Sequence, residues 1–401
     1  MKVYFESYGC TLNKAETSLY INSLIQNGDS IVEDPEDADL SIIGTCVVIK
    51  KTEEHMMRRI SELSRITNVK VVGCMSPIKS EFLNGNRIET IDRDYFRNFY
   101  GGSIDTSIID AEIVEGIPIN QGCTGKCKFC ISHIARGPLV SRKPEKIVNQ
   151  IKMLLERNKR EIRITSLDTA AYGRDIDIRL PDLMNMITSI DADFKLRVGM
   201  MEPKNTKEIA DRLMEAYENP KVFKFLHIPV QSGDDSVLES MNREYRASDF
   251  LEIVGKFRKK FHESILSTDV IIGYYSEDSE SFEKTYKIIS MVEPDILNIT
   301  RFSPREYTLD YDKKTMPSNK MKENDLMLRD LHSRIIEKHF SKMIGKEEKI
   351  LITERGKNES YIGRDDAYRP VVVSGNLKMY GFYNAEITSF ENTSLFGRII
   401  Y

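Results

Sequence analysis

The six cysteines of this chain constrain its fold more than any other feature. Three of them lie close together in the sequence. Cys123, Cys127 and Cys130 form a C-x3-C-x2-C loop, called the cysteine loop below. Thiolates at this spacing can bind one iron–sulfur cluster, but a cubane has four irons and the loop supplies ligands for only three. One iron stays open, and an open metal position is where a substrate or cofactor binds.

Two other interpretations of these thiols are weaker. Disulfide bonds need an oxidising compartment, and the stretch from Met1 to Cys10 has no apolar signal-peptide segment. Zinc would require a fourth ligand, which His133 could supply as a Cys3His site. We therefore expect an iron–sulfur cluster in a cytoplasmic protein, with zinc as the alternative.

The other cysteines, Cys10, Cys46 and Cys74, are called the N-terminal cysteine set below. They lie far apart in the sequence, yet each follows a short β-prone run and precedes a helical pattern. The runs are Val3–Ser7, Leu40–Thr45 and Val69–Gly73. If these runs are parallel strands, their carboxyl ends gather at one edge of a sheet, where ligands bind in α/β folds. The pattern predicts a second three-cysteine cluster with an open iron, and a buried structural role is the alternative for each cysteine alone.

The rhythm of strands and helices divides the 401 residues into three predicted domains. Residues 1–104 alternate strand and helix and end near Gly101-Gly102-Ser103, which indicates an open parallel α/β domain. Residues 109–338 repeat βα units, which predicts a parallel sheet curling into a full or partial barrel. Residues 341–401 contain short β-like runs broken by glycines, as in a small antiparallel β-barrel.

The predicted elements of the second and third domains follow from apolar periodicity. The helices are Pro144–Arg157, Thr206–Tyr217, Ala247–Phe261, Ser279–Val292 and Met321–Phe340. The strands are Glu161–Ser166, Lys195–Met200, Phe223–Val230, Ile265–Gly273, Ile296–Phe302, Lys349–Thr353, Val371–Ser374 and Asn384–Thr388. The formal net charge of −4 excludes a globally basic protein, and no apolar run is long enough to cross a bilayer.

The cysteine loop resembles the signature loop of the radical SAM enzymes, in which the open iron binds the amino and carboxylate groups of S-adenosylmethionine. Phe129 matches the aromatic residue that this family places close to the adenine of the cofactor. The whole chain resembles the methylthiotransferases, which combine a three-cysteine N-terminal domain, a radical SAM barrel and a C-terminal TRAM β-barrel. The matching stretches are Tyr8-Gly9-Cys10-Thr-Leu-Asn13, Gly73-Cys74-Met75, Ala135-Arg136-Gly137, Asp168-Thr-Ala-Ala-Tyr172-Gly173, His227-Ile-Pro-Val-Gln231-Ser232-Gly233 and Arg301-Phe-Ser-Pro-Arg305.

Three stretches look most like the archaeal and eukaryotic branch of that family: Tyr8 to Lys14, Arg197 to Met201 and Lys224 to Pro229. The chain departs from the family at two places. Gly44-Thr45-Cys46 stands where Asn-Thr-Cys is frequent, and Gly273-Tyr-Tyr-Ser-Glu277 stands where Gly-Phe-Pro-Gly-Glu is frequent. The first change keeps the thiolate, whereas the second removes a Pro-Gly turn and leaves the loop shape open.

The resemblance implies an enzyme that adds a methylthio group to C2 of N6-threonylcarbamoyladenosine at position 37 of tRNA. It implies two [4Fe–4S] clusters and S-adenosylmethionine, whose cleavage yields a 5′-deoxyadenosyl radical, while the N-terminal cluster carries the sulfur. The implied partners are the tRNA anticodon stem-loop and an electron donor such as flavodoxin or ferredoxin. The protein is expected to be a monomer and not to bind membranes. Methylthiolation of isopentenyladenosine or of a ribosomal-protein aspartate remains open, as does an iron–sulfur carrier without catalysis.

Further residues are candidates for binding the cofactor. Asp168 follows a predicted strand, where its carboxylate could accept from the cofactor's ammonium, and a helix N-cap is the alternative. Gln231 and Ser232 also follow a strand, with a plain turn as the alternative. Arg136 could pair with a carboxylate or phosphate, and Arg136 or Arg305 could bind the carboxylate of a threonylcarbamoyl group on the substrate. His227 lies in an apolar strand and reads as a core histidine.

Candidates for RNA binding come from the tail, whose charge is nearly balanced. They are Lys357, Arg364, Arg369, Lys378 and Arg398 for phosphate contacts, and Tyr361, Tyr368 and Phe382 for base stacking. Arg58 and Arg59 of the N-terminal domain are further candidates. For each residue a solvated surface position is the alternative.

Overall fold

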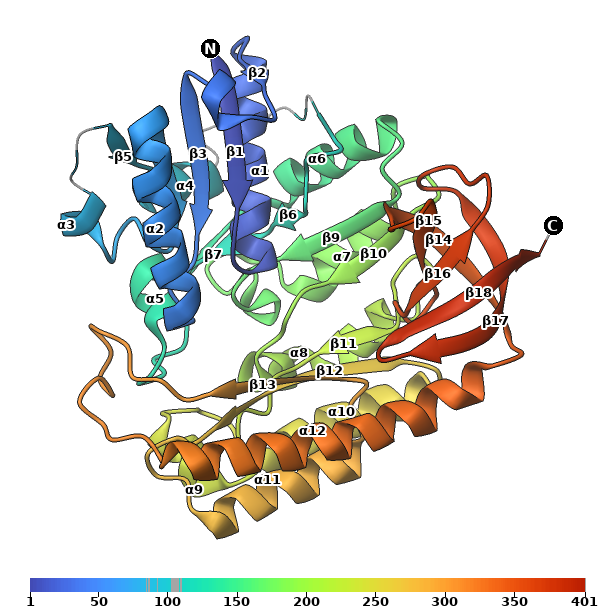
Figure 1. The fold of residues 1–401 in the computed structure, drawn as a ribbon. Coiled ribbons are helices and arrows are strands. Elements are labelled where there is room, and N and C mark those ends of the chain that lie inside the picture. Colours follow the sequence, from blue (N-terminus) through green and yellow to red (C-terminus); the bar gives the residue numbers. More distant parts are fainter. Residues whose placement is uncertain (84, 86, 92, 102–107, 109, 401) are drawn as a thin grey trace. The chain divides into compact units, whose positions relative to one another are not determined.

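The computed structural model describes residues 1–83, 85, 87–91, 93–101, 108 and 110–400 (Figure 1). They form two compact units. Unit 1 contains Met1–Arg157, Arg163–Ile187 and Ser303–Tyr311, and unit 2 contains Asn158–Ile162, Thr188–Phe302 and Asp312–Tyr401. The predicted domain limits at 104 and 109, and the glycine-rich end at 102–103, lie outside the described residues, so the division into three domains stays a prediction.

Unit 1 begins with a parallel sheet in the order β2-β1-β3-β4-β5. Its strands are β1 (Lys2–Ser7), β2 (Ser30–Ile31), β3 (Leu40–Thr45), β4 (Asn68–Gly73) and β5 (Ile88–Thr90). The connecting helices are α1 (Thr11–Gln26), α2 (Lys50–Ile66), α3 (Ser80–Leu83) and α4 (Arg93–Tyr100). β3 is buried along its whole length, as expected for a central parallel strand covered on both faces. The three predicted N-terminal strands and the open parallel α/β fold are confirmed.

The second part of unit 1 holds the cysteine loop. Its elements are β6 (Ile117–Pro118), β7 (Asn120–Gln121), α5 (Ile131–Arg136), β8 (Val140–Ser141), α6 (Pro144–Glu156), β9 (Glu161–Thr165), the 3-10 turn η2 (Thr169–Ala171) and α7 (Leu180–Thr188). β6 pairs in parallel with β9. β7 pairs antiparallel with β8, so the two ends of the segment that carries the cysteine loop lie next to each other.

Unit 2 continues the βα repeat with β10 (Lys195–Val198), α8 (Pro203–Ala216), β11 (Phe225–His227), α9 (Asp235–Ser240), α10 (Ala247–Lys260), β12 (Ile265–Ile272), α11 (Ser279–Val292) and β13 (Ile296–Arg301). β11, β12 and β13 are parallel neighbours, and a bridge between Leu196 and Val222 joins the β10 segment to the next one. Each strand thus pairs with the next in sequence, as the predicted partial barrel requires. β11 is shorter than the predicted Phe223–Val230, because Pro229 has no N–H to donate to a ladder.

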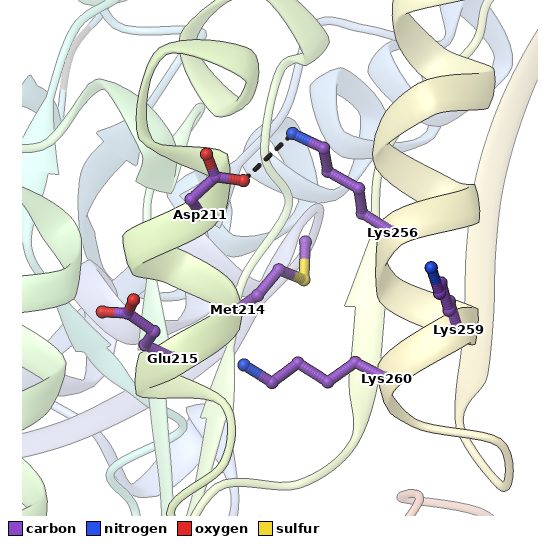
Figure 2. Close-up of a pocket in the computed structure, with 6 residues that line it drawn as sticks. All are labelled: Asp211, Met214, Glu215, Lys256, Lys259 and Lys260. Carbon is purple, nitrogen blue, oxygen red and sulfur yellow. Dashed lines mark hydrogen bonds and ion pairs between the residues drawn. The ribbon is translucent and has the colours of Figure 1, made fainter.

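On the outer side of unit 2, α8 and α10 flank a pocket of about 440 Å³ (Figure 2). Asp211, Met214 and Glu215 line it from α8, and three lysines line it from α10. Lys256 forms an ion pair with Asp211 at 3.0 Å, and Lys260 pairs with Glu218 at 2.6 Å. Because acidic neighbours pair with Lys256 and Lys260, we interpret the pocket as a groove between two surface helices.

The C-terminal segment of unit 2 forms a closed barrel in the order β14-β15-β16-β18-β17. The strands are β14 (Glu347–Arg355), β15 (Ser360–Arg364), β16 (Pro370–Ser374), β17 (Phe382–Glu391) and β18 (Ser394–Ile400). The predicted barrel is confirmed, but the expectation of purely antiparallel pairing is wrong, because β16 and β18 run parallel. Five strands in a ring cannot all alternate in direction, so an odd barrel needs a parallel pair to close.

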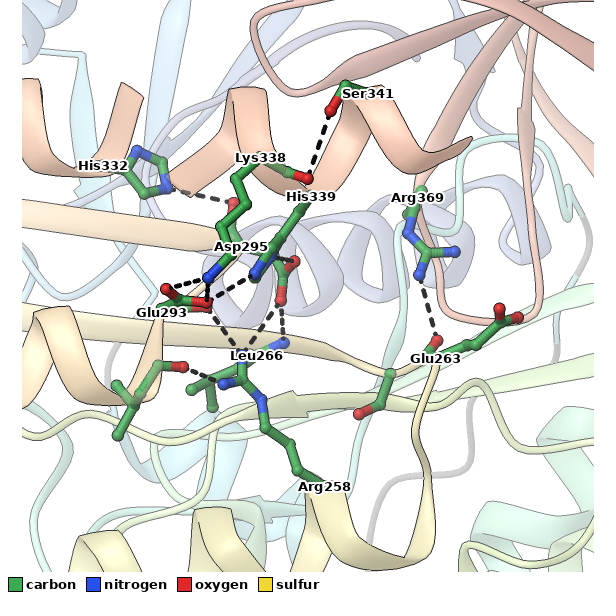
Figure 3. A network of polar contacts seen from close by, with 12 residues as sticks. Arg258, Glu263, Leu266, Glu293, Asp295, His332, Lys338, His339, Ser341 and Arg369 are labelled. Carbon is green, nitrogen blue, oxygen red and sulfur yellow. Dashed lines mark hydrogen bonds and ion pairs between the residues drawn. The ribbon is translucent and has the colours of Figure 1, made fainter. Parts of the chain in front are cut away.

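A long helix, α12 (Ser318–Phe340), followed by the turn η3 (Ser341–Met343), precedes this barrel. Figure 3 shows how its end is fixed to the start of β13. The Asp295 carboxylate contacts His339 Nδ1 at 2.9 Å and accepts the backbone N–H of Leu266 at 3.0 Å. Glu293 accepts from Lys338 at 2.6 Å and contacts the other ring nitrogen of His339 at 3.2 Å. In the described residues, no helix is both long and apolar enough to span a bilayer.

Candidate functional site

The N-terminal cysteine set lies at one edge of the unit 1 sheet. β1, β3 and β4 are neighbours, and their ends are level because Ser7 pairs with Gly44 and Thr45 pairs with Gly73. The three cysteines follow directly or within three residues of these ends. The backbone N–H of Cys74 donates to the carbonyl oxygen of Thr45 at 3.2 Å, which fixes one strand end to the next. The predicted placement at the carboxyl edge is confirmed.

Glycines next to two of these cysteines allow the strand ends to approach closely. Gly9 and Gly73 have φ angles of +92° and +99°, which favour glycine. A Cβ atom at Gly9 would lie 2.7 Å from Cβ of Cys46, and one at Gly73 would lie 2.6 Å from the carbonyl oxygen of Thr45. The segments around Cys10, Cys46 and Cys74 can therefore approach closely only because positions 9 and 73 have no side chain.

The thiols of this set influence one another electrostatically. Burial raises the pKa of Cys46 to about 11, and Cys74 and Cys10 contribute in the same direction. Burial also raises the pKa of Cys74, while Arg136 lowers it. Metals bind the thiolate form, so binding a cluster here would release protons. Three adjacent thiols at one edge fit the three-ligand cluster that the sequence predicts.

The cysteine loop is folded by its own backbone. The N–H of Cys123 donates to the carbonyl of Gly137 at 3.1 Å, and the N–H of Cys130 donates to the carbonyl of Cys127 at 3.2 Å. The N–H of Gly125 donates to Sγ of Cys123 at 3.2 Å. A Cβ atom at Gly125 would lie 3.4 Å and 3.6 Å from the sulfur atoms of Cys123 and Cys127, so both flank this glycine. The loop thus presents sulfur atoms around a compact turn, and an N–H group already points at one of them.

The zinc alternative gains no support from His133. Its pKa is raised mainly by a side-chain hydrogen bond with Cys130, so the ring lies beside the loop. Within the described ranges, however, no three His, Cys, Asp or Glu side chains converge as ligands of one ion. A cubane spreads its ligands over separate irons and does not require that convergence. All six cysteines are free thiols in this structure.

Arg136 connects the two cysteine sets. It is the last residue of α5, which follows the cysteine loop, and its side chain is only 3% exposed. It forms an ion pair with Glu16 of α1 and donates to Oδ1 of Asn13. Its Nε–H donates to Sγ of Cys74 at 3.2 Å. Arg136 therefore pairs with the carboxylate of Glu16, and its role in binding a cofactor or substrate stays a prediction.

The second candidate arginine is paired in the same way. Arg305 is buried and forms an ion pair with Glu53 of α2. Burial lowers the pKa of Arg305, and Glu306 and Cys46 act in the opposite direction. Both arginines therefore lie beside the N-terminal cysteine set and bind carboxylates of its helices.

The other predicted cofactor residues lie in two places. Phe129 is half-buried within the cysteine loop, and Asp168 is buried at the start of η2. The Asp168 carboxylate accepts the backbone N–H of Ala170 at 3.0 Å, which confirms the N-cap alternative. Burial raises the pKa of Cys123 to about 12, and the Asp168 carboxylate acts in the same direction. Asp168 therefore lies close to the cysteine loop, and its role in binding the cofactor stays a prediction.

Gln231, Ser232 and His227 belong to unit 2. Gln231 has a φ angle of +62°, as in a turn, and Ser232 is buried with its Oγ accepting the N–H of Asp234 at 3.2 Å. His227 contacts the carboxylate of Asp269 at 2.8 Å through Nε2. The histidine is therefore satisfied by a neighbouring strand, as the core interpretation requires, and the cofactor roles of Gln231 and Ser232 stay predictions.

Sequence reasoning missed Glu16 and Tyr100. Glu16 is buried on α1, and its carboxylate accepts from the Tyr100 hydroxyl at 2.7 Å as well as from Arg136. One signal was available, because Glu16 follows Leu12 and Ala15 on the buried side of a helix, and carboxylates in that setting need a partner.

The tail candidates for RNA binding divide into two groups. Arg364, Arg369 and Arg398 form ion pairs with Glu354, Asp365 and Glu386 of the same barrel. Lys357 and Lys378 are exposed. Tyr361 and Phe382 are half-buried, and Tyr368 packs against Phe223 and Phe225, with ring centroids 4.9 and 5.3 Å apart. In the N-terminal domain, Arg59 binds Glu6 and Glu62, whereas Arg58 is exposed.

Comparisons with known proteins agree with this layout. Residues 2–91 match uncharacterized protein family UPF0004, residues 117–289 match the radical SAM superfamily, and residues 341–400 match the TRAM domain. A relative from Methanocaldococcus jannaschii, named a probable threonylcarbamoyladenosine tRNA methylthiotransferase, is 35% identical, and the match covers 100% of this chain and 97% of the relative. The human threonylcarbamoyladenosine tRNA methylthiotransferase is 30% identical over 95% of this chain and 70% of the relative.

Solved structures show a similar fold at low identity. The radical S-adenosylmethionine methyltransferase TsrM from Kitasatospora setae, solved with cobalamin and a [4Fe–4S] cluster, gives a TM-score of 0.56 at 12% identity and covers 77% of each chain. The cobalamin-dependent S-adenosylmethionine radical enzyme OxsB gives a TM-score of 0.52 at 11% identity, covering 84% of this chain and 56% of OxsB. These likenesses support the fold alone.

Proposed function

Because this chain belongs to the family of archaeal and eukaryotic threonylcarbamoyladenosine tRNA methylthiotransferases, we propose that it adds a methylthio group to C2 of N6-threonylcarbamoyladenosine at position 37 of tRNA. We further propose that it uses two [4Fe–4S] clusters and S-adenosylmethionine, and that it works as a cytoplasmic monomer with a flavodoxin or ferredoxin as electron donor. The proposal covers the whole chain, since its first relatives are matched over nearly their full length.

One observation carries the proposal. Two three-cysteine sets occur in the same compact unit, and Arg136 links the helix of the cysteine loop to Cys74 of the other set. An iron–sulfur carrier can hold two clusters, but the [4Fe–4S] clusters of ferredoxins have four cysteine ligands, whereas each set here supplies only three. Two clusters held in one unit suit a reaction in which one site generates reactivity and the other supplies sulfur.

The roles of the residues follow from their positions. When bound, the loop cluster supplies the electron that cleaves S-adenosylmethionine. Cys123, Cys127 and Cys130 would hold that cluster, and Phe129 lies next to the third ligand, where a ring can cover an adenine. Asp168 stays a candidate for orienting the cofactor. Cys10, Cys46 and Cys74 would hold the second cluster; Cys46 and Cys74 are buried in one core with Ile131 and Ala135 of α5, and Cys10 is exposed.

Contacts with tRNA are expected from exposed basic residues rather than from the paired arginines. Lys357 and Lys378 are exposed on the C-terminal barrel. We expect Lys357→Glu with Lys378→Glu to weaken tRNA binding, because each lost phosphate contact removes a counterion-release contribution. Lys287→Glu, a charge reversal at an exposed position of α11, is the matched control for each of these two changes made singly. A point change is the better test, since Leu351 and Ala367 of this barrel share a core with Phe223 and Phe225, which truncation at 341 would uncover.

The decisive experiment concerns the substrate. Anaerobically reconstituted protein is given S-adenosylmethionine, a reductant and tRNA that carries either threonylcarbamoyladenosine or unmodified adenosine, and the nucleosides are measured by mass spectrometry. We expect methylthiolated product only from the first tRNA. Equal reaction of both, or reaction only with an isopentenylated tRNA or a ribosomal protein, would reject the substrate. A variant with Cys10, Cys46 and Cys74 replaced by Ala serves as the control without sulfur transfer.

A further inference from the structure

The buried arginine at the end of α5 bears on the reduction potential of the N-terminal cluster. We propose that Arg136 is a positioning residue that donates a hydrogen bond to a ligand sulfur of the N-terminal cluster and raises the reduction potential of that cluster. The proposal rests on the proposed function, because it requires a cluster on Cys10, Cys46 and Cys74.

The contacts of Arg136 leave it one orientation. Nε–H donates to Sγ of Cys74 at 3.2 Å, Nη1 pairs with Glu16, and Nη2 donates to Asn13. The guanidinium is planar with donors at fixed angles, so three partners on three sides determine its position. Because the side chain is 3% exposed, water does not compete for these donors. An N–H group therefore stays directed at the Cys74 sulfur.

The charges around Arg136 determine the sign of its effect. An arginine guanidinium stays protonated in proteins, so Arg136 places a positive charge beside the Cys74 sulfur. Glu16 is the counter-charge, and its carboxylate is also held by the Tyr100 hydroxyl at 2.7 Å. A reduced cluster carries one more negative charge than an oxidised one, and hydrogen bonds to the sulfurs set cluster potentials. The cation at Cys74 therefore favours the reduced state.

The position of Arg136 in the chain ties this effect to the cysteine loop. α5 follows Cys130, a ligand of the loop, and ends at Arg136, so a helix of six residues, about 9 Å long, separates the two contacts. Ile131 and Ala135 of this helix pack in one core with Cys46 and Cys74. α5 thus acts as a rigid spacer whose two ends belong to different cysteine sets, and displacement of the loop would move the N–H group away from Cys74.

The test measures the N-terminal cluster alone. Full-length protein with Cys123, Cys127 and Cys130 replaced by Ala is reconstituted, its iron is counted, and its midpoint potential is measured by redox titration with electron paramagnetic resonance. In this background we expect Arg136→Gln to lower the potential and Glu16→Gln to raise it. Arg142→Gln is the matched control, since Arg142 is equally buried but donates to Pro118 and Gln150 at 2.9 Å. It should leave the potential unchanged.

The outcomes separate this inference from the proposed function. If the loop-deleted protein binds no iron, the proposed N-terminal cluster fails, and the inference fails with it. If the cluster forms and Arg136→Gln shifts the potential no more than Arg142→Gln, the inference alone is overturned. If Arg136→Gln fails to fold, Glu16→Gln decides, because it keeps the hydrogen bond to Cys74 and removes only the counter-charge. An unchanged or lowered potential in Glu16→Gln would overturn the assignment.

Discussion

Tyr368 tests whether an aromatic residue of the C-terminal barrel packs inside its unit or stacks on RNA. Its ring lies against Phe223 and Phe225, and its hydroxyl donates to the carboxylate of Glu161 at 2.7 Å. Arg197 and Arg364 lie over the same ring, 5.4 Å and 4.7 Å from its centroid. These contacts predict that substitutions at Tyr368 reduce the stability of unit 2.

The expected magnitudes differ between two substitutions. Tyr368→Phe removes one hydrogen bond to a buried carboxylate, since Glu161 is 5% exposed. Hydrogen bonds to charged groups contribute about 1.5–3 kcal/mol, so we expect a loss of about 2 kcal/mol. Tyr368→Ala also removes the ring, which adds about 3 kcal/mol at the low end of the range for aromatic truncations because the side chain is only half-buried. The alanine variant should therefore lose about 5 kcal/mol.

Urea unfolding followed by far-UV circular dichroism measures both changes. Tyr361→Phe is the control, because among the hydrogen bonds of the described residues none involves the Tyr361 hydroxyl, and we expect it to be neutral. tRNA binding is measured in parallel on the folded variants. If Tyr368→Phe is as stable as the parent protein and Tyr368→Ala weakens tRNA binding without unfolding at lower urea, the packing role is refuted and base stacking is supported.

Four further predictions concern the clusters, the pH response and the tRNA. Reconstituted protein should bind about eight irons, as two cubanes require, and replacing the cysteine loop by alanines should halve that number. Replacing the N-terminal cysteine set should abolish methylthiolated product in chromatography while 5′-deoxyadenosine formation persists; loss of both in a folded variant would contradict the division of roles. The hydrogen bond that His339 donates to the Asp295 carboxylate raises the pKa of His339 above its ordinary 6.5. The stabilisation that His339→Gln removes should therefore be full below about pH 6.5 and vanish as the pH rises through the folded-state pKa. A difference in unfolding free energy that does not depend on pH would contradict this. tRNA affinity in filter binding should fall steeply with salt, and a flat response would exclude phosphate contacts.

The sequence was sufficient to place the cysteines because strand ends leave a local signature. Cys46 and Cys74 directly follow β3 and β4, and the β-prone runs before them are continuous enough to predict parallel strands. Level register then brings the ends together without further information. The cysteine loop could be placed with even less information, since its three thiols lie close together in the sequence.

The partners of buried charges could not be predicted in this way. Arg136 pairs with Glu16, which is 120 residues away in sequence, and Arg305 pairs with Glu53. No local pattern links such residues, because only the packing of α5 against the N-terminal core brings them together. The packing of Tyr368 could not be predicted for a related reason. An aromatic residue beside basic residues on a small barrel resembles an RNA contact until the neighbouring Phe223 and Phe225 are known.

The two departures from the family pattern have physical explanations in the structure. At Gly44 a Cβ atom would collide with Oγ1 of Thr17, which donates to the carbonyl of Asn13 and so cannot easily move. Glycine at 44 and threonine at 17 therefore occur as a pair, and the strand end before Cys46 keeps its course without an asparagine.

The second departure shows which residue controls the loop after β12. Without Pro-Gly, the turn is closed by Glu277, whose carboxylate accepts the N–H of Gly273 at 2.6 Å and whose own N–H donates to the carbonyl of Tyr274 at 2.9 Å. Burial raises the pKa of Glu277 to about 7, while hydrogen bonds from the backbone N–H groups of Gly273 and Tyr274 lower this pKa. Gly273 itself has a φ angle of +75°, and a Cβ atom there would collide with Met321. The glycine and the glutamate, which this chain shares with its family, thus fix the turn although all three residues between them differ.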